Sequence, residues 1–333
     1  MLYVTTRSRN DAFTAHRTIC SELAPDEGMY LPFKMAELDR KQVLELGEIS
    51  FCQAVADTIN RFFTCNITGW DVEFCIGRYP AKIVDVRHKI LAAQTWHNQA
   101  WDYAWAEKAL AERICGASMP FSGATGWVKI VIRMAFLTGL FGELIRKGAV
   151  DPEHPVDVAV PSGDFSVPMS VWYAKQMGLP IANIICGCAD NGAVWDLLHL
   201  GAVKTSENMP AHLERLICGV LGQEEAVRYS QICALEEEYS LAPFAAEKLR
   251  KGMFAAVISP DRLAGTIPSL YRTSDYILGP AAALAYSGLL DYRAKTGETR
   301  PALLLAERSP VCDKEFVARA MNMSVLQLKE ILK

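Results

Sequence analysis

Hydrophobic residues in the first 150 positions recur at the spacing of amphipathic helices. Over residues 41–63 they stand three or four positions apart, which predicts a helical segment: Val43, Leu46, Ile49, Val55, Ile59 and Phe62. Further helices are expected around residues 101–114 and over 127–147, and the second is apolar on both faces, as a buried helix is. Residues 115–126 are rich in Gly, Ser and Pro and are expected to form a loop.

From residue 155 the pattern changes to short apolar runs that alternate with helical stretches. Buried strands are predicted at residues 156–160, 181–186, 254–258 and 302–305. Helices are predicted at residues 167–177, 192–200 and 211–221. A strand that is apolar throughout is buried on both faces. The alternation therefore predicts an α/β fold, in which a parallel sheet is covered by helices on both faces.

The charge balance, the apolar stretches and the cysteine pattern argue against a nucleic-acid surface, a membrane span and a metal site. The chain has 34 Lys and Arg and 38 Asp and Glu, a formal net charge of −4, which argues against a nucleic-acid surface. Its longest apolar stretches are interrupted by Lys129 and Arg133 or by Gly279-Pro280, so no membrane span is expected. The ten cysteines form no CxxC pair and have no His at ligand spacing, so no metal site is expected. Without a leader pattern at the N-terminus, we expect reduced thiols and a cytoplasmic location.

A glycine-containing turn follows the first of the C-terminal strands. The strand at 156–160 runs into PSGDFS at 161–166, and a helix is expected to begin near Pro168. Strand, tight turn and helix N-terminus form a geometry that binds phosphate through free backbone N–H groups. The same residues are more commonly those of a structural turn in which Ser166 is the helix N-cap and Pro168 stands in the first helical turn.

Several segments in the same order resemble the threonine synthases, which are fold-type-II enzymes dependent on pyridoxal phosphate. They read YVTTR at 3–7, LAPDEGMYLP at 23–32, PSGDF at 161–165, YAKQMGLPI at 173–181, ICGCADN at 185–191, LERL at 213–216, GPAAA at 279–283 and AERSP at 306–310. The resemblance covers most of the chain. It implies the large-domain fold of these enzymes, a parallel sheet covered by helices on both faces.

The resemblance places an alanine where the family has its Schiff-base lysine. The family motif WHGPTxAFKD is matched by WHNQAWDYAW at 96–105, and Ala104 occupies the lysine position. A methyl group cannot form an imine, so no catalytic residue is expected there. Lys108, one helical turn later, is a possible substitute or a solvated surface lysine.

The phosphate loop that the resemblance implies, Ser162, Gly163, Asp164, Phe165 and Ser166, is altered. Asp164 replaces the family's Asn and Ser166 its second Gly. Two like unit charges about 4 Å apart repel each other by about 4 kcal/mol at an effective dielectric constant of 20, so Asp164 opposes a phosphate. Asp164 is instead expected to act as a built-in anion at the helix N-terminus.

Two further departures concern the ring-nitrogen partner and the small domain. Ala306 and Glu307 stand where the family has the Ser-Thr pair that faces the pyridine nitrogen, although Glu307 could pair with a protonated ring. The chain passes from residue 118 almost directly to 123–129, so roughly two or three βαβ units of the small domain are missing. We therefore expect a segment over 1–118 and an α/β remainder over 119–333, forming one compact unit.

Two hypotheses on function follow from these departures. In the first, the protein is a degenerate relative without cofactor, which binds a small anionic or amino-acid ligand or associates with a partner, including a second copy of itself. In the second, it is an active pyridoxal-phosphate enzyme that converts O-phosphohomoserine to threonine or performs a related elimination or replacement. The second requires an amine from Lys108, Lys89 or Lys129.

Overall fold

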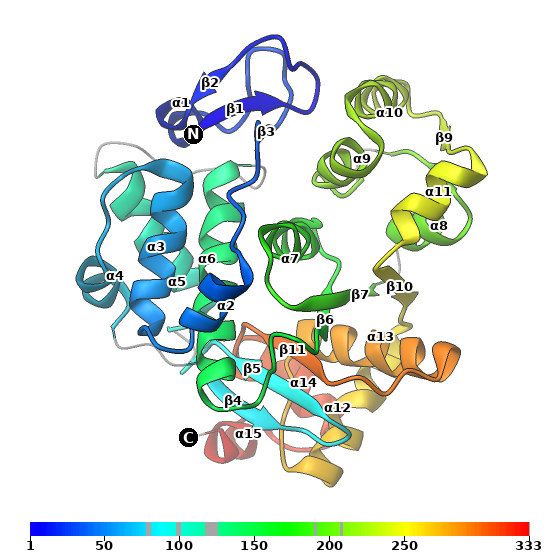
Figure 1. The fold of residues 1–333 in the computed structure, drawn as a ribbon. Coiled ribbons are helices and arrows are strands. Elements are labelled where there is room, and N and C mark those ends of the chain that lie inside the picture. Colours follow the sequence, from blue (N-terminus) through cyan, green and yellow to red (C-terminus); the bar gives the residue numbers. More distant parts are fainter. Residues whose placement is uncertain (78–80, 98–100, 117–125, 190–191, 207–208, 333) are drawn as a thin grey trace.

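The computed structural model describes residues 1–77, 81–97, 101–116, 126–189, 192–206 and 209–332. Its centre is a six-stranded sheet of order β10-β7-β6-β11-β5-β4 (Figure 1). The strands are β4 (Lys82–Asp85), β5 (Ile90–Gln94), β6 (Val156–Pro161), β7 (Ile181–Cys188), β10 (Met253–Val257) and β11 (Ala302–Ala306). All neighbours pair in parallel except β4, which runs antiparallel to β5. The predicted α/β class is confirmed, with a mixed rather than purely parallel sheet.

Helices cover both faces of this sheet. Those on one face are α6 (Trp127–Arg146) and α7 (Ser166–Met177), and those on the other are α12 (Pro260–Ser274), α13 (Pro280–Thr296) and α14 (Lys314–Ala320). In β6, Val158 and Val160 belong to the first core cluster and Ala159 to the second. Successive side chains of a strand point to opposite faces. This alternation between two apolar layers explains why the predicted strands are hydrophobic at nearly every position.

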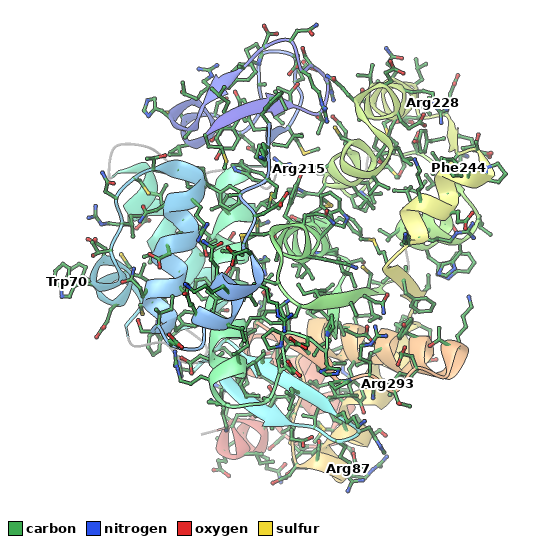
Figure 2. All side chains as sticks on the ribbon, viewed as in Figure 1. Trp70, Arg87, Arg215, Arg228, Phe244 and Arg293 are labelled. Atoms are coloured by element: carbon green, nitrogen blue, oxygen red, sulfur yellow. The ribbon has the colours of Figure 1, made fainter. Side chains whose placement is uncertain are left out.

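The N-terminal segment packs beside α6 and α7. It contains β1 (Leu2–Thr5), β2 (Phe13–Thr14), β3 (Tyr30–Pro32), α1 (Ala15–Cys20), α2 (Arg40–Glu45), α3 (Phe51–Phe63), α4 (Gly69–Ile76) and α5 (Tyr103–Cys115). The predicted helix over 41–63 is divided, because the Ser50 side chain accepts from Gln53 N–H and starts α3 anew. Trp70 projects from α4 into solvent (Figure 2).

The remaining elements lie between β7 and β10 in the sequence or near the C-terminus (Figure 1). They are α8 (Ala193–His199), β8 (Ala202–Lys204), α9 (Leu213–Leu221), α10 (Gln223–Leu235), β9 (Glu238–Ser240), α11 (Pro243–Arg250), the short 3₁₀ helix Pro310–Asp313 and α15 (Val325–Ile331). Arg215 of α9, labelled in Figure 2, donates from Nε and Nη2 to the carbonyl oxygen of Tyr30 at 3.3 and 3.1 Å. This buried contact joins α9 to strand β3 of the N-terminal segment.

The structure adds features that the sequence pattern did not predict. Strands β4 and β5 fall between the predicted helices at 41–63 and 101–114, where no strand was predicted, and the N-cap of α7 is Phe165 rather than Ser166. Only residues 116–126 connect α5 to α6. The expected division after residue 118 lies outside the described residues, and one apolar cluster extends from Tyr3 to Leu305. No helix in the described ranges is long and apolar enough to span a bilayer.

Candidate functional site

A pocket of about 430 Å³ lies where the strands β6 and β11 end at their carboxyl termini. The helices α5 and α13 begin at its wall. Its lining residues are Asp102, Tyr103, Ala104, Glu107, Lys129, Arg133, Pro161, Gly279, Pro280, Ala281, Ala282, Leu284, Leu305, Glu307, Arg308 and Asp313. The carboxyl edge of strands in an open α/β sheet is the usual position of a ligand site in this fold class.

Ala104 stands on the pocket wall, at the second residue of α5. Asp102 caps this helix by accepting the N–H of Trp105, which fixes the first turn against the pocket. The candidate substitute Lys108 does not line the pocket; its side chain is 72% exposed and lies 3.9 Å from Glu112. Lys89 lies in the turn between β4 and β5, and it does not line the pocket either. Of the three lysines considered from the sequence, the fold brings only Lys129 to the site.

The turn between β6 and α7 has the expected strand–turn–helix geometry, and the N–H groups of Ser162, Phe165 and Ser166 are already bonded within the protein. Gly163 and Phe165 have positive φ values of 46° and 67°. The N–H groups of Ser162 and Phe165 donate to the carbonyl oxygens of Gly187 and Ser162 at 2.8 and 2.7 Å. Ser166 donates to Asp164 Oδ1 from both its backbone N–H, at 2.9 Å, and its hydroxyl, at 2.5 Å. The carboxylate of Asp164 therefore occupies the helix N-terminus.

Asp164 is also paired with the lysine of the pocket wall. Lys129 Nζ lies 3.0 Å from Asp164 Oδ2. Burial raises the pKa of Asp164, but the Ser166 hydrogen bonds and the Lys129 ammonium outweigh it and lower that pKa to about 2. Asp164 is thus ionised at neutral pH.

A second charged group on the wall centres on Arg133, which is almost fully buried. Its Nη1 donates to Glu307 Oε1, and its Nη2 lies 3.9 Å from Glu107 Oε2. The guanidinium also stacks 4.1 Å from the ring centre of Tyr103. Glu307 follows directly after β11, whereas its neighbour Ala306 is buried at the end of that strand. The position expected to face a ring nitrogen is therefore engaged by Arg133.

Three buried polar atoms of this group have no hydrogen-bond partner among the residues that the structure describes. They are Tyr103 Oη, Glu107 Oε1 and Arg133 Nε. Burial raises the pKa of Glu107, although the Arg133 and Lys129 charges oppose that rise. A buried polar atom without a partner costs about 1–3 kcal/mol, so a bound molecule that supplied the missing partners would be stabilised here.

The residues Tyr103, Glu107 and Arg133 were not identified as site residues from the sequence. One signal was present, because Lys129 and Arg133 are two cations four residues apart in an otherwise apolar stretch. This spacing puts both on one face of α6. Cations on a buried helix require carboxylate partners, so a search for acidic residues that could face Lys129 and Arg133 could have located the pocket.

The site lacks the features that would hold pyridoxal phosphate. The pocket wall presents the methyl group of Ala104 at the lysine position of the family motif. The turn presents an ionised Asp164, and the N–H groups of Phe165 and Ser166 beside it are already bonded within the protein. Lys129 lies in the pocket, but its amine is engaged in an ion pair. The residues present therefore do not fit this cofactor.

Comparisons with known proteins agree with the fold. Residues 2–78 match the family model described as "Threonine synthase N terminus". The human and crab-eating macaque (Macaca fascicularis) proteins named "Threonine synthase-like 1" are each 25% identical over 187 residues, which is 51% of this chain and 25% of theirs. The matched region therefore spans about a quarter of the length of these curated relatives.

The solved structures show the same architecture. Threonine synthase from Brucella melitensis, solved with bound pyridoxal phosphate, aligns with a TM-score of 0.82 and 17% identity over 100% of this chain and 94% of its own. The yeast threonine synthase aligns with a TM-score of 0.84 and 15% identity over 99% and 93%. The chain is therefore similar to threonine synthases in its N-terminal segment and in the region matched by the threonine synthase-like proteins, and it has the threonine synthase fold.

Proposed function

We propose that this protein is a non-catalytic member of its family, which binds a small ligand in the pocket between α5, α6 and α13. The observation that carries the proposal is Ala104 on the pocket wall. A covalent imine requires a primary amine, and the pocket offers none that is uncommitted. On this proposal the protein binds a ligand at the usual ligand site of the fold but forms no imine there.

The turn before α7 supports the same proposal. Asp164 fills the helix N-terminus that would otherwise receive a phosphate, and its carboxylate is bonded on both oxygens. A phosphate would have to displace these bonds and approach an ionised carboxylate. The site therefore disfavours phosphorylated ligands, and we propose an amino-acid-like ligand without phosphate in preference to an anionic one.

The alternative proposal is an active pyridoxal-phosphate enzyme that uses Lys129 as its amine. The observation in its favour is that Lys129 lines the same pocket as Ala104. Against it stands the 3.0 Å ion pair with Asp164, because an ammonium has no lone pair with which to attack an aldehyde. This reading also requires anchoring of the phosphate at a turn that carries a negative charge.

The experiment that separates the two proposals is incubation of the purified protein with pyridoxal phosphate, followed by borohydride reduction and peptide mass spectrometry. We expect no imine absorbance and no adduct on one specific lysine. The matched variant Lys129→Met controls for non-specific labelling of surface lysines. A reduced adduct confined to Lys129, with turnover of O-phosphohomoserine, would overturn the non-catalytic proposal.

A cytoplasmic location and self-association are also proposed. Support for self-association comes from apolar surface exposed in the single chain, such as the stacked rings of Trp70 and Phe74, which are 71% and 79% exposed. Light scattering of the purified protein over a concentration series would test it. A mass equal to one chain at all concentrations would reject self-association.

A further inference from the structure

The charges that line the pocket do not balance. Arg133 is one guanidinium facing two carboxylates, those of Glu107 and Glu307, and all three side chains are at least three-quarters buried. The other two cations of the lining are already paired, Lys129 with Asp164 at 3.0 Å and Arg308 with Asp313 at 3.7 Å. One carboxylate of the Arg133 group is thus in excess.

The excess negative charge is located at Glu107. Its Oε2 is 3.9 Å from Arg133, and its Oε1 has no hydrogen-bond partner, although the residue is only 8% exposed. An isolated carboxylate at such a position is strongly disfavoured unless a cation or a donor approaches it. The pocket therefore carries an acceptor that the described protein residues leave unused.

The pocket wall next to this acceptor carries a small side chain, that of Ala104, which leaves space for a ligand. Ala104 precedes Glu107 by three residues on α5, so both lie on one helical face and line the same pocket. We propose that the pocket binds its ligand through a primary ammonium group, received by Glu107 and Glu307 in the space beside Ala104. This inference rests on the proposed function as a ligand-binding pocket, and it names the chemical group that the pocket selects.

An ammonium fits this space better than the other common cations. Within the described residues, no group of three or more His, Cys, Asp or Glu could hold a metal ion. An ammonium has three donors, and the pocket offers Glu107 Oε1 as an acceptor without a partner. A guanidinium would place a second planar cation against Arg133, which already stacks on Tyr103.

The inference is tested first by supplying the ammonium from the protein itself. Ala104→Lys places an amine in the proposed space, and Ala104→Met fills it with an uncharged chain of similar length and helix propensity. We expect the thermal midpoint of Ala104→Lys to exceed that of Ala104→Met by about 2 °C or more at pH 7.5. Adding Glu107→Gln to each variant should remove this difference, because the excess carboxylate is then absent.

The second test uses free ligands with the unmodified protein. Calorimetric titration with butylammonium should show saturable binding, and butanoate and inorganic phosphate at equal ionic strength should show none. Glu107→Gln should weaken butylammonium binding at least tenfold. Ala104→Lys should abolish it by occupying the same space.

Equal midpoints for Ala104→Lys and Ala104→Met, or equal heats for butylammonium and butanoate, would overturn the inference. Either result would mean that Glu107 is protonated and that the pocket carries no excess charge. These outcomes are independent of the imine experiment. An adduct on Lys129 would reject the non-catalytic function and leave the comparison of the two Ala104 variants unaffected.

Discussion

Lys129 and Asp164 are 35 residues apart in the chain, and their side chains meet at 3.0 Å on the rim of the pocket. The contact ties α6 to the turn before α7. Asp164 Oδ1 accepts a hydrogen bond from the Ser166 N–H, and Oδ2 accepts one from Lys129 Nζ, so both oxygens of the carboxylate have a donor within the protein. The pair thus places an ionised carboxylate at the helix N-terminus, where it repels an outside anion, and holds the lysine amine in an ion pair inside the site.

Replacing Lys129 with Met should make the protein less stable at neutral pH. The lowered pKa of Asp164, about 2 against an ordinary 3.8, stabilises the fold above pH 4, and this stabilisation is lost as the pH falls toward 2. Without the ammonium this pKa rises toward its ordinary value, so the variant should lose less stability between pH 5 and pH 3. Urea unfolding across that range measures both effects.

Lys108→Met serves as the control for this variant. Lys108 is exposed and pairs only loosely with Glu112, so its replacement should change stability by no more than about 0.5 kcal/mol. Parallel pH profiles for Lys129→Met and the unmodified protein would contradict the role given to the Lys129–Asp164 pair.

Removing the carboxylate from the turn should create affinity for phosphate. In Asp164→Asn combined with Ser166→Gly, the negative charge is gone and Lys129 is released toward the turn. We expect calorimetric binding of inorganic phosphate to rise at least tenfold over the unmodified protein. Asp261→Asn, a change of the same kind in the first turn of α12, should leave phosphate binding unaltered. If the double variant also fails to bind, the shape of the turn rather than its charge excludes the anion.

Arg133→Met should be among the most destabilising changes at the site. It leaves two carboxylates, Glu107 and Glu307, without their shared cation in a buried position, a loss of about 3–5 kcal/mol in unfolding free energy. Adding Glu107→Gln and Glu307→Gln should recover part of that loss. Urea unfolding at pH 7.5 compares them, and a loss below about 1 kcal/mol would show that the carboxylates do not depend on Arg133.

Glu107→Gln should alter how stability depends on pH. Burial raises the pKa of Glu107 above its ordinary 4.5, so the native state holds this proton more tightly than the unfolded chain. The stability that this tightly held proton gives the native state is complete below pH 4.5 and is lost as the pH rises through the raised pKa of Glu107. The stability of the variant relative to the unmodified protein should therefore increase from pH 4.5 to pH 8. A difference independent of pH would indicate that Glu107 titrates normally.

Gly187→Ala should disrupt the packing of β7 against α13. A Cβ at Gly187 would lie 2.1 Å from the carbonyl oxygen of Leu284 and 2.8 Å from the N–H nitrogen of Ala285, so the helix would have to move. We expect a loss of several kcal/mol, on the order of other overpacked core sites. Gly265→Ala is the matched control, because nothing lies within 4 Å of its Cβ position in α12 and alanine favours a helix by about 1 kcal/mol. Equal midpoints of thermal unfolding for the two variants would refute the close contact.

The strands predicted from the sequence are those that the sheet buries on both faces. β11 is apolar throughout and β6 is apolar except for the buried Asp157, so their runs stand out without knowledge of the fold. β4 was not predicted, because an edge strand with half-exposed residues lacks that continuous apolar run. β5 follows a tight turn after β4, and its burial depends on pairing with β11.

The site divides in the same way. Ala104, Asp164 and Glu307 were identified from the sequence because each departs from a family motif at a defined position. Glu107 and Arg133 were not, because their meaning depends on contacts between distant segments, such as the pair of Arg133 with Glu307 across 174 residues. A charged residue in a helix is indistinguishable from a solvated one until its neighbours are known.

By itself the sequence determined the α/β class and the central strands, and it predicted the loss of an amine at position 104, since apolar runs and single substitutions are local properties of the chain. The tertiary structure alone decided that Lys129 replaces Lys108 and Lys89 as the lysine of the site, and that one guanidinium serves two carboxylates. Those facts depend on which side chains share a buried space, because the energy of a charge inside a protein is set by its neighbours in three dimensions.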